Sequence, residues 1–270
     1  MKVALMAEHD LHRFLNFADT LADAARAAIL PYFRNAHSVE HKGGSRFDPV
    51  TEADRGAEKA MRALIEREFP EHGVIGEEFG TKPSKSGYSW ALDPVDGTRA
   101  FIAGLPLWGV LIALAYEGKP IIGVMDQPYL DERYKGWGVG ASLTTRGETR
   151  PLRTRSCEKL SDAILSTTDA TLFHGAETHA FERVRAAARL TRYGYDCYAY
   201  AMVAMGGIDV VIESGLRAWD IQALIPIVEG AGGGVTSWDG GDAAHGGQVL
   251  ACGDARVREE AMTLLKNAAA

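Results

Sequence analysis

The segment 90–99, Trp-Ala-Leu-Asp-Pro-Val-Asp-Gly-Thr-Arg, limits the folds open to this chain more than any other part of the sequence. Its apolar start is typical of a buried strand. Pro94 has no N–H for a ladder hydrogen bond, so we expect the chain to turn there. Asp96 is a favourable N-cap for a helix that begins at Gly97 and Thr98. The segment therefore predicts a strand, a tight turn and a helix N-terminus in direct succession.

The same segment carries oxygen ligands of the kind that hard cations prefer. Asp93 and Asp96 are joined by a stiff turn and can face one point, and the main-chain carbonyl of Val95 can face it too. These oxygens suit Mg²⁺, and a helix N-terminus offers free N–H groups to an anion such as phosphate. The segment therefore indicates a combined metal and phosphate site. The alternative is that Asp-Pro and Asp-Gly only mark a surface turn.

The composition is that of a protein with an ordinary globular core. Of the 270 residues, 46% are hydrophobic and 24% are charged, which allows one large domain or two closely packed ones. The net charge of −7 and the lack of a basic run argue against nucleic-acid binding. Three scattered cysteines suit a reducing compartment. Without a signal-peptide core or a membrane-length apolar run, we expect a cytoplasmic protein with no nucleic-acid or membrane partner.

The order of the expected elements divides the chain into two halves. In residues 1–150, helices over 10–32 and 51–69 precede a run of hairpins, which predicts an α+β half with an antiparallel sheet and the main metal motif. In residues 151–270, strands alternate with helices, including one over 219–229, which predicts an α/β half. We expect the halves to pack as one compact unit with the site between them.

Two helix starts carry acidic residues that bear on the site. Asp10 is a candidate N-cap for the first long helix. Thr51 is a candidate N-cap for the second helix, with Asp54 at the capping-box position. Asp54 and Glu58 lie one helical turn apart, a spacing typical of a solvated acidic face. A carboxylate in a first helical turn can also point into a site, so both interpretations stay open.

Acidic residues recur at the expected strand ends and helix starts. Taken alone, each is more typical of a turn or a cap than of a metal ligand. Together, and next to glycine, proline or tryptophan at strand-to-helix junctions, they are better explained by one shared metal site. The residues are Glu77, Asp93, Asp96 and Asp220.

Three motifs together resemble the inositol monophosphatase family. They are Gly-Glu-Glu at 76–78, Asp-Pro-Val-Asp-Gly-Thr at 93–98, and Trp-Asp at 219–220 followed by Glu-Gly-Ala-Gly-Gly at 229–233. The resemblance covers nearly the whole chain, from residue 42 to the final helix. It implies a layered αβαβα sandwich, the sugar-phosphatase type of α/β fold. It also implies a lithium-sensitive, Mg²⁺-dependent phosphomonoesterase that forms a homodimer, with roughly two or three ions per site and Mn²⁺ as a substitute.

The resemblance assigns a role to each matching residue. The implied metal ligands are Glu77, Asp93, the main-chain carbonyl of Val95, Asp96 and Asp220. Thr98 and Asp54 would orient the attacking water, and Glu77 would also take part in catalysis. Phosphate-ester hydrolysis needs neutralised phosphoryl charge, an activated water and a stabilised leaving group, which bound metal ions supply. The sequence offers no competing nucleophile, since it has neither Gly-x-Ser-x-Gly nor a cysteine in a phosphate-cradling loop.

The substrate class is indicated by residues near the expected leaving group. The segments 101–108 and 194–200 are more similar to the histidinol-phosphate phosphatase branch than to true inositol phosphatases, which carry small neutral residues where Asp196 stands. Histidinol phosphate carries an ammonium and an imidazole, and Asp196 with Glu213 would supply two acceptors for them. Glu213 matches the family position that contacts the non-phosphate part of the substrate. Asp196 is equally explained as the N-cap of the helix that follows.

Further substrate contacts are expected close to these residues. Lys42 lies in a glycine-rich segment and could lean over the site, while Gly97 and Thr98 begin the expected phosphate-binding helix. Arg217 could pair with the substrate phosphate or form a salt bridge with Glu213, and both alternatives stay open. We expect hydrolysis of L-histidinol phosphate, a small phosphate monoester, in histidine biosynthesis.

Three other hypotheses remain for comparison. Within the same class, the chain could be an inositol 1-phosphate or other sugar-phosphate phosphatase. A non-catalytic module that binds a phosphorylated ligand would have no need for the water-orienting Thr98. A nicotinamide oxidoreductase is indicated only by the G-x-G-x-x-A match at 136–141, which needs a helix directly afterwards. Residues 142–150 are rich in threonine and glycine and are typical of a hairpin instead.

Overall fold

The computed structural model describes residues 8–34, 39–41 and 49–266 of the chain. The expectations for Lys42, the glycine-rich segment around it and the side chain of Thr51 lie outside the described residues. Among the described helices, none combines the length and the apolar character that crossing a membrane requires.

The N-terminal part of the described chain builds a large sheet covered by two helices. The helices are α1 (Glu8–Ile29) and α2 (Glu52–Glu68). The strands are β3 (Gly73–Gly76), β4 (Gly80–Lys82), β5 (Tyr88–Asp96), β6 (Gly109–Tyr116), β7 (Lys119–Gln127), β8 (Glu132–Gly136), β9 (Ala141–Thr145) and β10 (Glu148–Pro151). Their order in the sheet is β10-β9-β8-β7-β6-β5-β3-β4. Every neighbouring pair is antiparallel except β3 and β5, which run parallel.

Shorter elements lie beside this sheet. The pair β1 (Val39–His41) and β2 (Pro49–Thr51) is antiparallel, and β2 contacts α3 (Thr98–Ile102), the short helix that follows β5. The central strand β5 is buried along most of its length, and residues 93–96 form the end of this buried strand. This end of β5 carries the acidic motif.

The C-terminal part of the described chain forms a second, mixed sheet. Its strands are β11 (Ile164–Thr167), β12 (Leu190–Tyr193), β13 (Val210–Leu216), β14 (Gly234–Thr236) and β15 (Gly247–Cys252), in the order β12-β11-β13-β15-β14. Strand β11 runs parallel to both neighbours, while β15 is antiparallel to both of its own. The helices are α4 (Ala176–Ala187), α5 (Cys197–Ala204), α6 (Ala218–Ile221), α7 (Leu224–Gly230) and α8 (Ala255–Leu265), with 3₁₀ turns η2 (Leu160–Asp162) and η3 (Ala170–Leu172).

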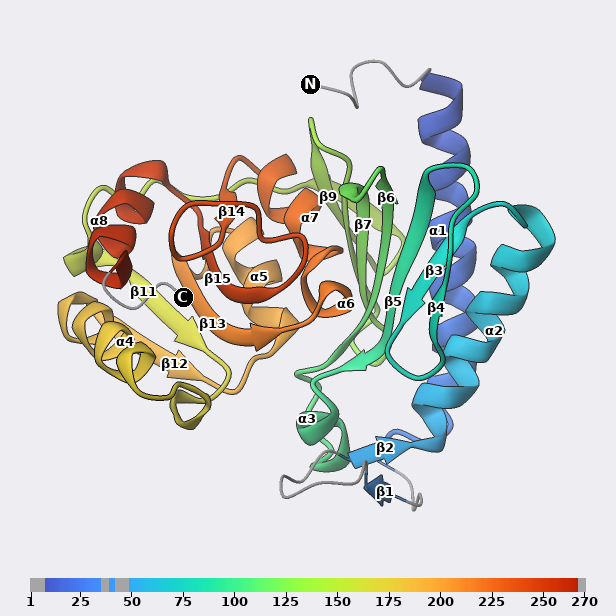
Figure 1. The fold of residues 1–270 in the computed structure, drawn as a ribbon, viewed down its shortest axis with the longest axis horizontal. Helices are drawn as coiled ribbons and strands as arrows, with labels where there is room; N and C mark the ends of the chain where they lie inside the picture. The colour runs from blue at the N-terminus through green and yellow to red at the C-terminus, as the bar shows by residue number, and fades with distance from the viewer. Residues whose placement is uncertain (1–7, 35–38, 42–48, 267–270) are drawn as a thin grey trace.

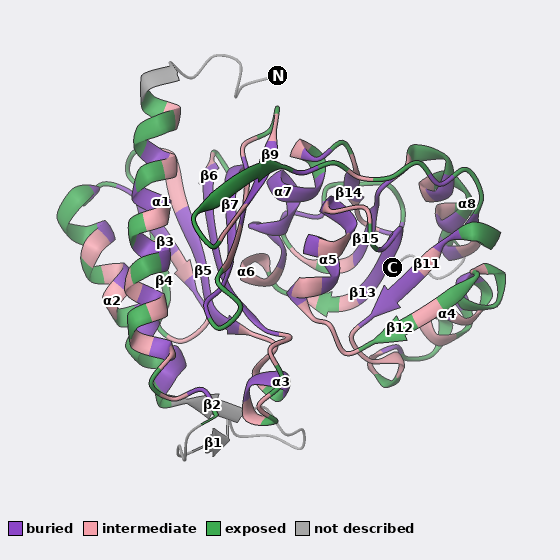
Figure 2. Cartoon of the chain, turned by 180° about the vertical axis from the view of Figure 1, so that it is seen from behind, coloured by how far each residue is buried: buried purple, intermediate pink, exposed green. Residues whose placement is uncertain are grey.

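The elements stack in five layers (Figure 1). Helices α1 and α2 cover one face of the large sheet, and α5, α6 and α7 lie between the two sheets. Helices α4 and α8 cover the outer face of the second sheet. Buried side chains form three cores: one between α1, α2 and the large sheet, one around the middle helices between the two sheets, and one between the second sheet and α4 and α8. Figure 2 shows buried residues concentrated on β5–β7 and the middle helices. The expected layered αβαβα fold is confirmed, while the boundary near residue 150 stays a prediction.

The turn after β5 differs from the expected geometry. The strand does not end before Pro94 but continues to Asp96, and the ladder with β6 shifts register between Asp93 and Asp96. A bulge of this kind accommodates the missing N–H of proline within a strand. The N-cap of α3 is Gly97 at φ 89°, so the prediction that Asp96 caps this helix is wrong. A Cβ on Gly97 would lie 2.8 Å from the Leu107 carbonyl oxygen, so only glycine fits without a shift.

Two helix boundaries also correct the expectation. Helix α1 begins at Glu8, so Asp10 lies inside it instead of capping it. The single helix expected over 219–229 is broken into α6 and α7. Pro226 explains the break, because a proline inside a continuous helix removes a hydrogen bond to the preceding turn, whereas the first turn of α7 tolerates it. After Gly136 the chain turns from β8 into β9 and forms no helix there. The helix that a dinucleotide-binding motif needs is therefore missing after residue 141, as expected.

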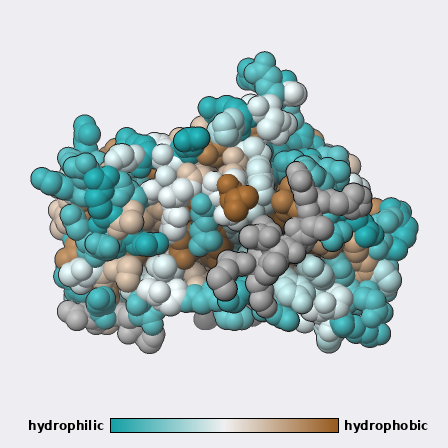
Figure 3. Space-filling model, turned by 90° about the horizontal axis from the view of Figure 1, so that it is seen from above, coloured by the Kyte–Doolittle hydropathy of each residue, from teal (hydrophilic) through white to brown (hydrophobic). Residues whose placement is uncertain are grey.

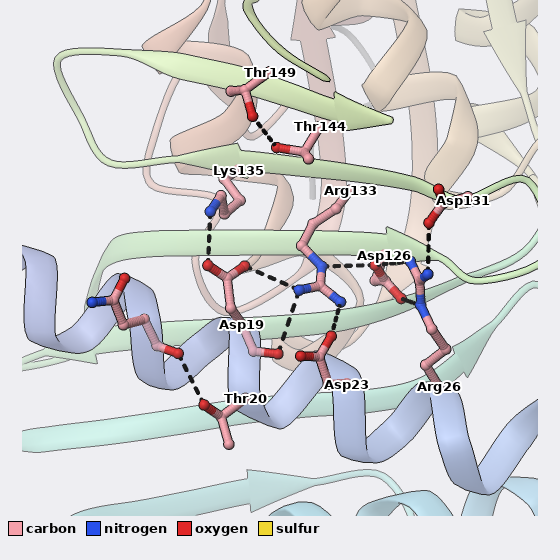
Figure 4. Close-up of polar contacts among 11 residues, drawn as sticks. Asp19, Thr20, Asp23, Arg26, Asp126, Asp131, Arg133, Lys135, Thr144 and Thr149 are labelled. Carbon is pink, nitrogen blue, oxygen red and sulfur yellow. Dashed lines mark hydrogen bonds and ion pairs between the residues drawn. The ribbon is translucent and has the colours of Figure 1, made fainter. Parts of the chain in front are cut away.

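A polar cluster fastens α1 to the large sheet (Figure 4). The fully buried Asp126 of β7 accepts hydrogen bonds from Arg26 Nη2 at 2.9 Å and from Arg133 Nε at 2.8 Å. Asp19 of α1 accepts from Arg133 and, at 2.8 Å, from Lys135 Nζ. The bonds from Arg26 Nη2 and Arg133 Nε reach Asp126 Oδ1, and Oδ2 accepts from Arg26 Nε at 3.2 Å. Both oxygens are therefore paired, and the burial of the carboxylate is compensated.

The surface seen in Figure 3 is mostly hydrophilic, and its hydrophobic areas are small, with the most prominent near the centre of that face. Two of the exposed large hydrophobic residues are Val139, at the β8–β9 turn, and Phe79, after β3. Scattered exposed apolar side chains of this kind are ordinary on protein surfaces.

Candidate metal centre

Three carboxylates converge where the two sheets face each other. Asp93 and Asp96 come from the end of β5, and Asp220 comes from α6, which packs against β5. One oxygen from each of the three lies within 4.8 Å of the others. The sequence prediction that these residues share one location is therefore met in geometry, and their function as ligands stays a prediction.

Burial and the repulsion between these carboxylates raise the pKa values of Asp93 and Asp96. Burial raises the pKa of Asp93 well above its usual range, and the charges of Glu77, Asp96 and Asp220 raise it further. Burial likewise raises the pKa of Asp96, with further contributions from Asp196 and Asp220. A bound cation would stabilise the ionised form of every member. The site therefore favours either added protons or a multivalent positive ion.

The donor set identifies which ion would fit. The converging side chains supply carboxylate oxygens, while the contribution of the Val95 carbonyl stays a prediction. Hard oxygen donors suit Mg²⁺, Ca²⁺ or Mn²⁺, whereas Zn²⁺ and copper ions prefer sites with histidine or cysteine. The residues present thus fit the hard divalent cation that the motif implies.

Glu77 lies on the loop after β3, outside the closest group but near enough to raise the pKa of Asp93. Glu58 of α2 holds this loop: its Oε2 accepts from the Glu78 N–H at 2.7 Å. A Cβ on Gly76 would lie 2.0 Å from Glu58 Oε1, so glycine allows the carboxylate to reach the loop. The solvated acidic face considered for α2 is wrong, because Glu58 is 0% exposed. Its loop-holding role had no signal in the sequence beyond that spacing.

Asp54 and Thr98 are the two residues that the sequence predicts to orient the attacking water. Asp54, in the first turn of α2, is 4% exposed, and its charge contributes to the raised pKa of Asp93. The Thr98 hydroxyl donates to the Val95 carbonyl at 3.1 Å, and the Val95 N–H donates to Asp93 Oδ1 at 3.1 Å. These bonds hold the turn rigidly. The water-orienting roles of Asp54 and Thr98 stay predictions.

Asp96 binds a helix N-terminus, although not the one expected. The Cys197 N–H, at the start of α5, donates to Asp96 Oδ2 at 2.6 Å. A carboxylate at this position is favoured by the helix dipole and by the free N–H groups of the first turn. The contact joins residues 101 positions apart and ties β5 to the helix layer between the sheets. Local sequence pattern could not reveal a partner at that separation.

Asp196 occupies the N-cap position of α5 but does not cap it with its side chain. Its backbone has φ 45° and ψ −134°, a conformation that L-residues adopt rarely and that costs about 1–3 kcal/mol. Burial raises the pKa of Asp196 to about 6, while the charge of Arg99 and a hydrogen bond with Thr168 lower it. The capping hypothesis for this side chain is wrong, and the strained backbone is of the kind found at functional sites.

Glu213 of β13 lies beside Asp196 and is only 3% exposed. Its Oε1 accepts from the Thr168 N–H at 2.7 Å and from the Thr168 hydroxyl at 3.0 Å. Burial raises the pKa of Glu213 to about 8, and the charge of Asp196 contributes to the increase. Two carboxyl groups with raised pKa values therefore adjoin the cluster.

Arg217 directly precedes α6. Its N–H donates to Asp220 Oδ2 at 2.6 Å, and its side chain is exposed. Within residues 49–266, Arg217 and Glu213 form no ion pair, so the salt-bridge alternative is not supported. Its pairing with a substrate phosphate stays a prediction.

A layered α/β fold with carboxylates that converge at a strand end fits a metal-dependent phosphatase, the class of the family that the chain matches. The chain belongs to the inositol monophosphatase family, whose profile matches residues 10–269. It is therefore a phosphoric monoester hydrolase by family.

Individual relatives agree on the class but differ in substrate. The chain is 42% identical to the bifunctional phosphatase IMPL2, chloroplastic, of Arabidopsis thaliana, over 97% of this chain and 77% of that protein. It is 39% identical to a histidinol-phosphatase of Chlorobaculum parvum, over 81% and 83% of the two chains. Among solved structures, an inositol monophosphatase from Zymomonas mobilis superimposes with a TM-score of 0.85 at 39% identity, over 97% of this chain and all of the other.

Proposed function

We propose that this protein is a Mg²⁺-dependent phosphomonoesterase that converts L-histidinol phosphate to L-histidinol and inorganic phosphate in histidine biosynthesis. The observation that carries the proposal is an acidic pair beside an acidic cluster. The charge of Asp196 contributes to the raised pKa of Glu213 and also to that of Asp96 in the cluster. A cation-binding subsite next to a metal centre suits a substrate whose leaving group is positively charged.

The residues of the cluster have distinct roles in this proposal. The groups that would hold Mg²⁺ are Glu77, Asp93, the Val95 carbonyl, Asp96 and Asp220. Bound there, Mg²⁺ supplies neutralisation of the phosphoryl charge and a water of lowered pKa. Asp54 and Thr98 orient that water through hydrogen bonds. Because Thr98 is bonded to the Val95 carbonyl, the water-orienting hydroxyl and the ligands belong to one rigid turn.

The remaining residues bind the two ends of the substrate. Asp196 and Glu213 accept hydrogen bonds from the ammonium and the imidazole of the leaving group. The phosphate lies against the amide of Gly97 and the guanidinium of Arg217. The Arg217 N–H donates a hydrogen bond to Asp220, which places Arg217 next to the cluster.

The test is phosphate release from L-histidinol phosphate, inositol 1-phosphate and fructose 1,6-bisphosphate, each with Mg²⁺ and with EDTA. We expect an EDTA-sensitive preference for L-histidinol phosphate. Asp196→Asn should lower kcat/KM for that substrate by about tenfold or more, because a charge-assisted hydrogen bond is lost, and should leave inositol 1-phosphate unaffected. Glu158→Gln removes an equal charge from an exposed pair with Arg256 and should change neither rate.

The outcomes separate the parts of the proposal. Preference for inositol 1-phosphate or the bisphosphate would keep the metal chemistry and reject the substrate. Equal effects of Asp196→Asn on all substrates would reject the cation-binding role of Asp196. Thermal stabilisation by phosphorylated ligands without phosphate release would favour a binding module.

Inositol 1-phosphate is the second candidate substrate. It is supported by the similarity to the Zymomonas mobilis inositol monophosphatase. Inositol offers hydroxyls and no cation, so two acidic groups beside the leaving group would gain nothing from it. We therefore rank it below L-histidinol phosphate. As the family resemblance implies, we also propose a cytoplasmic, lithium-sensitive homodimer.

A further inference from the structure

The acidic pair Asp196 and Glu213 lies where parallel strands of the second sheet end. Strand β11 runs parallel to both β12 and β13, so the carboxyl ends of the three strands meet at one edge of the sheet (Figure 1). Glu213 belongs to β13, and Asp196 follows β12 in the loop before α5. Because β11 is the middle strand of the three, the chain that leaves it at residues 167–169 lies between the two members of the pair.

Thr168 holds the carboxyl group of Glu213 through two donors. Its N–H donates to Glu213 Oε1 at 2.7 Å, and its hydroxyl donates to the same oxygen at 3.0 Å. Among the described residues, the hydrogen bond that Oε2 accepts is a longer one, from the Thr167 hydroxyl at 3.4 Å. Because Glu213 is 3% exposed, these bonds replace the water that its carboxyl group would otherwise bind. They leave Oε2 as the oxygen with capacity for a substrate donor.

Thr168 also holds the loop that carries Asp196. The Thr168 carbonyl accepts from the Gly194 N–H at 2.9 Å, directly after the end of β12. Gly194 and Asp196 both have positive φ values, 81° and 45°, and a strained backbone of this kind persists only where its surroundings fix it. A hydrogen bond with Thr168 also lowers the pKa of Asp196. One residue therefore contacts the side chain of Glu213 and the backbone that positions Asp196.

The neighbours of Thr168 are explained by other contacts. Asp169 Oδ1 accepts from the Thr171 N–H at 2.9 Å and caps η3, and Asp169 Oδ2 lies 3.6 Å from Arg99 Nη1. The Thr167 hydroxyl lies too far from Glu213 for a strong hydrogen bond. Thr168 is therefore the residue of this segment whose hydroxyl acts most directly on the acidic pair.

We propose that Thr168 is a positioning residue of the cation-binding pair, whose hydroxyl fixes the Glu213 carboxyl group with Oε2 toward the cationic leaving group. The inference rests on the proposed function and adds to it a residue that acts through Glu213. An acceptor that is oriented before the substrate arrives binds more tightly, because less freedom is lost on binding. A leaving group that offers hydroxyls and no cation gains less from this orientation.

The test measures kcat and KM for L-histidinol phosphate and inositol 1-phosphate at saturating Mg²⁺. Thr168→Val removes the hydroxyl and keeps a similar shape and the backbone donor. We expect its KM for L-histidinol phosphate to rise about tenfold, because a hydrogen bond to an acidic group is lost, while kcat stays close to the wild-type value. Both constants for inositol 1-phosphate should stay unchanged. Thr168→Ser keeps the hydroxyl and should restore the KM for L-histidinol phosphate.

Thr178→Val is the matched control. It also removes the hydroxyl of a half-buried threonine, one that donates to the Phe173 carbonyl at 2.9 Å at the start of α4. We expect wild-type constants for both substrates in this variant. Melting temperatures in EDTA, measured for all variants, should show that Thr168→Val is folded as the wild type is.

Three results would overturn the inference while leaving the proposed substrate in place. The first is a wild-type KM for L-histidinol phosphate in Thr168→Val. The second is an equal rise in KM for both substrates, which a merely structural role predicts. The third is a large fall in the melting temperature of Thr168→Val, which would assign the hydroxyl to folding. A wild type without preference for L-histidinol phosphate would instead reject the proposed function, and this inference with it.

Discussion

At the scale of single residues, the site combines carboxyl groups that the fold keeps in different protonation states. Burial raises the pKa of Glu213 to about 8 and that of Asp196 to about 6. Near neutral pH, Glu213 is therefore mostly protonated and Asp196 mostly ionised. A cationic leaving group would favour loss of the remaining proton, so binding and ionisation are linked at this pair.

This linkage gives a pH-dependent prediction for substrate binding. As the pH rises from 6 to about 8.5, first Asp196 and then Glu213 become ionised, while an alkyl ammonium stays charged. We expect the KM for L-histidinol phosphate to fall over this range. Glu213→Gln cannot ionise, so it should raise KM and flatten its pH dependence above pH 7. Steady-state kinetics at fixed, saturating Mg²⁺ measure both effects. An identical pH profile in Glu213→Gln would contradict the role of Glu213.

The convergence of Asp93 and Asp96 could be predicted, because the two residues lie three positions apart on one tight turn. Their partners could not. The Asp96 contact with Cys197 spans 101 positions, and the strained backbone of Asp196 depends on how α5 meets the second sheet. The burial of Glu58 likewise depends on the packing of α2 against the β3 loop. These features come from tertiary structure, on which local pattern carries no information.

At the scale of elements, helix α1 is held to the large sheet by the buried Asp126 and its two arginines, Arg26 and Arg133. We expect Asp126→Ala to lower the free energy of unfolding by about 3 kcal/mol or more, because both guanidinium groups lose a buried partner. Urea unfolding measures the change. The control Asp131→Asn removes the charge of an exposed partner of the same Arg26, while asparagine tolerates the left-handed backbone at φ 55° and can still accept from the Arg146 N–H, so it should cost at most about 1 kcal/mol. Equal losses in the two variants would contradict the clamp.

Element boundaries followed the sequence where strong local signals exist. Apolar periodicity predicts α2, and the run of hairpins predicted for the first half of the chain includes the β6–β7 pair. The prediction fails where two signals compete. Pro94 was expected to end β5, but pairing with β6 continues around a bulge. The apolar residues after Asp220 predict one continuous helix, whereas Pro226 separates α6 from α7.

At the scale of the whole molecule, the site depends on two sheets that are brought together by the middle helices. Asp93 and Asp96 belong to the large sheet, whereas Asp220, Asp196 and Glu213 come from the C-terminal part of the chain. The layered architecture was predicted from a resemblance carried by several motifs at once, since periodicity alone indicates only α/β structure. The structure and the family profile confirm that architecture.

The central claim is that this shared acidic cluster is a metal centre for phosphoester hydrolysis. The most direct measurement is the rate of phosphate release from L-histidinol phosphate against Mg²⁺ concentration, for wild type and Asp93→Asn. The wild-type rate should rise with Mg²⁺ and vanish in EDTA. Asp93→Asn should lose more than the roughly 100-fold that an outer partner contributes, yet melt no lower than wild type in EDTA, because a repelled charge is gone. Full activity in Asp93→Asn, or in wild type with EDTA, would contradict the account.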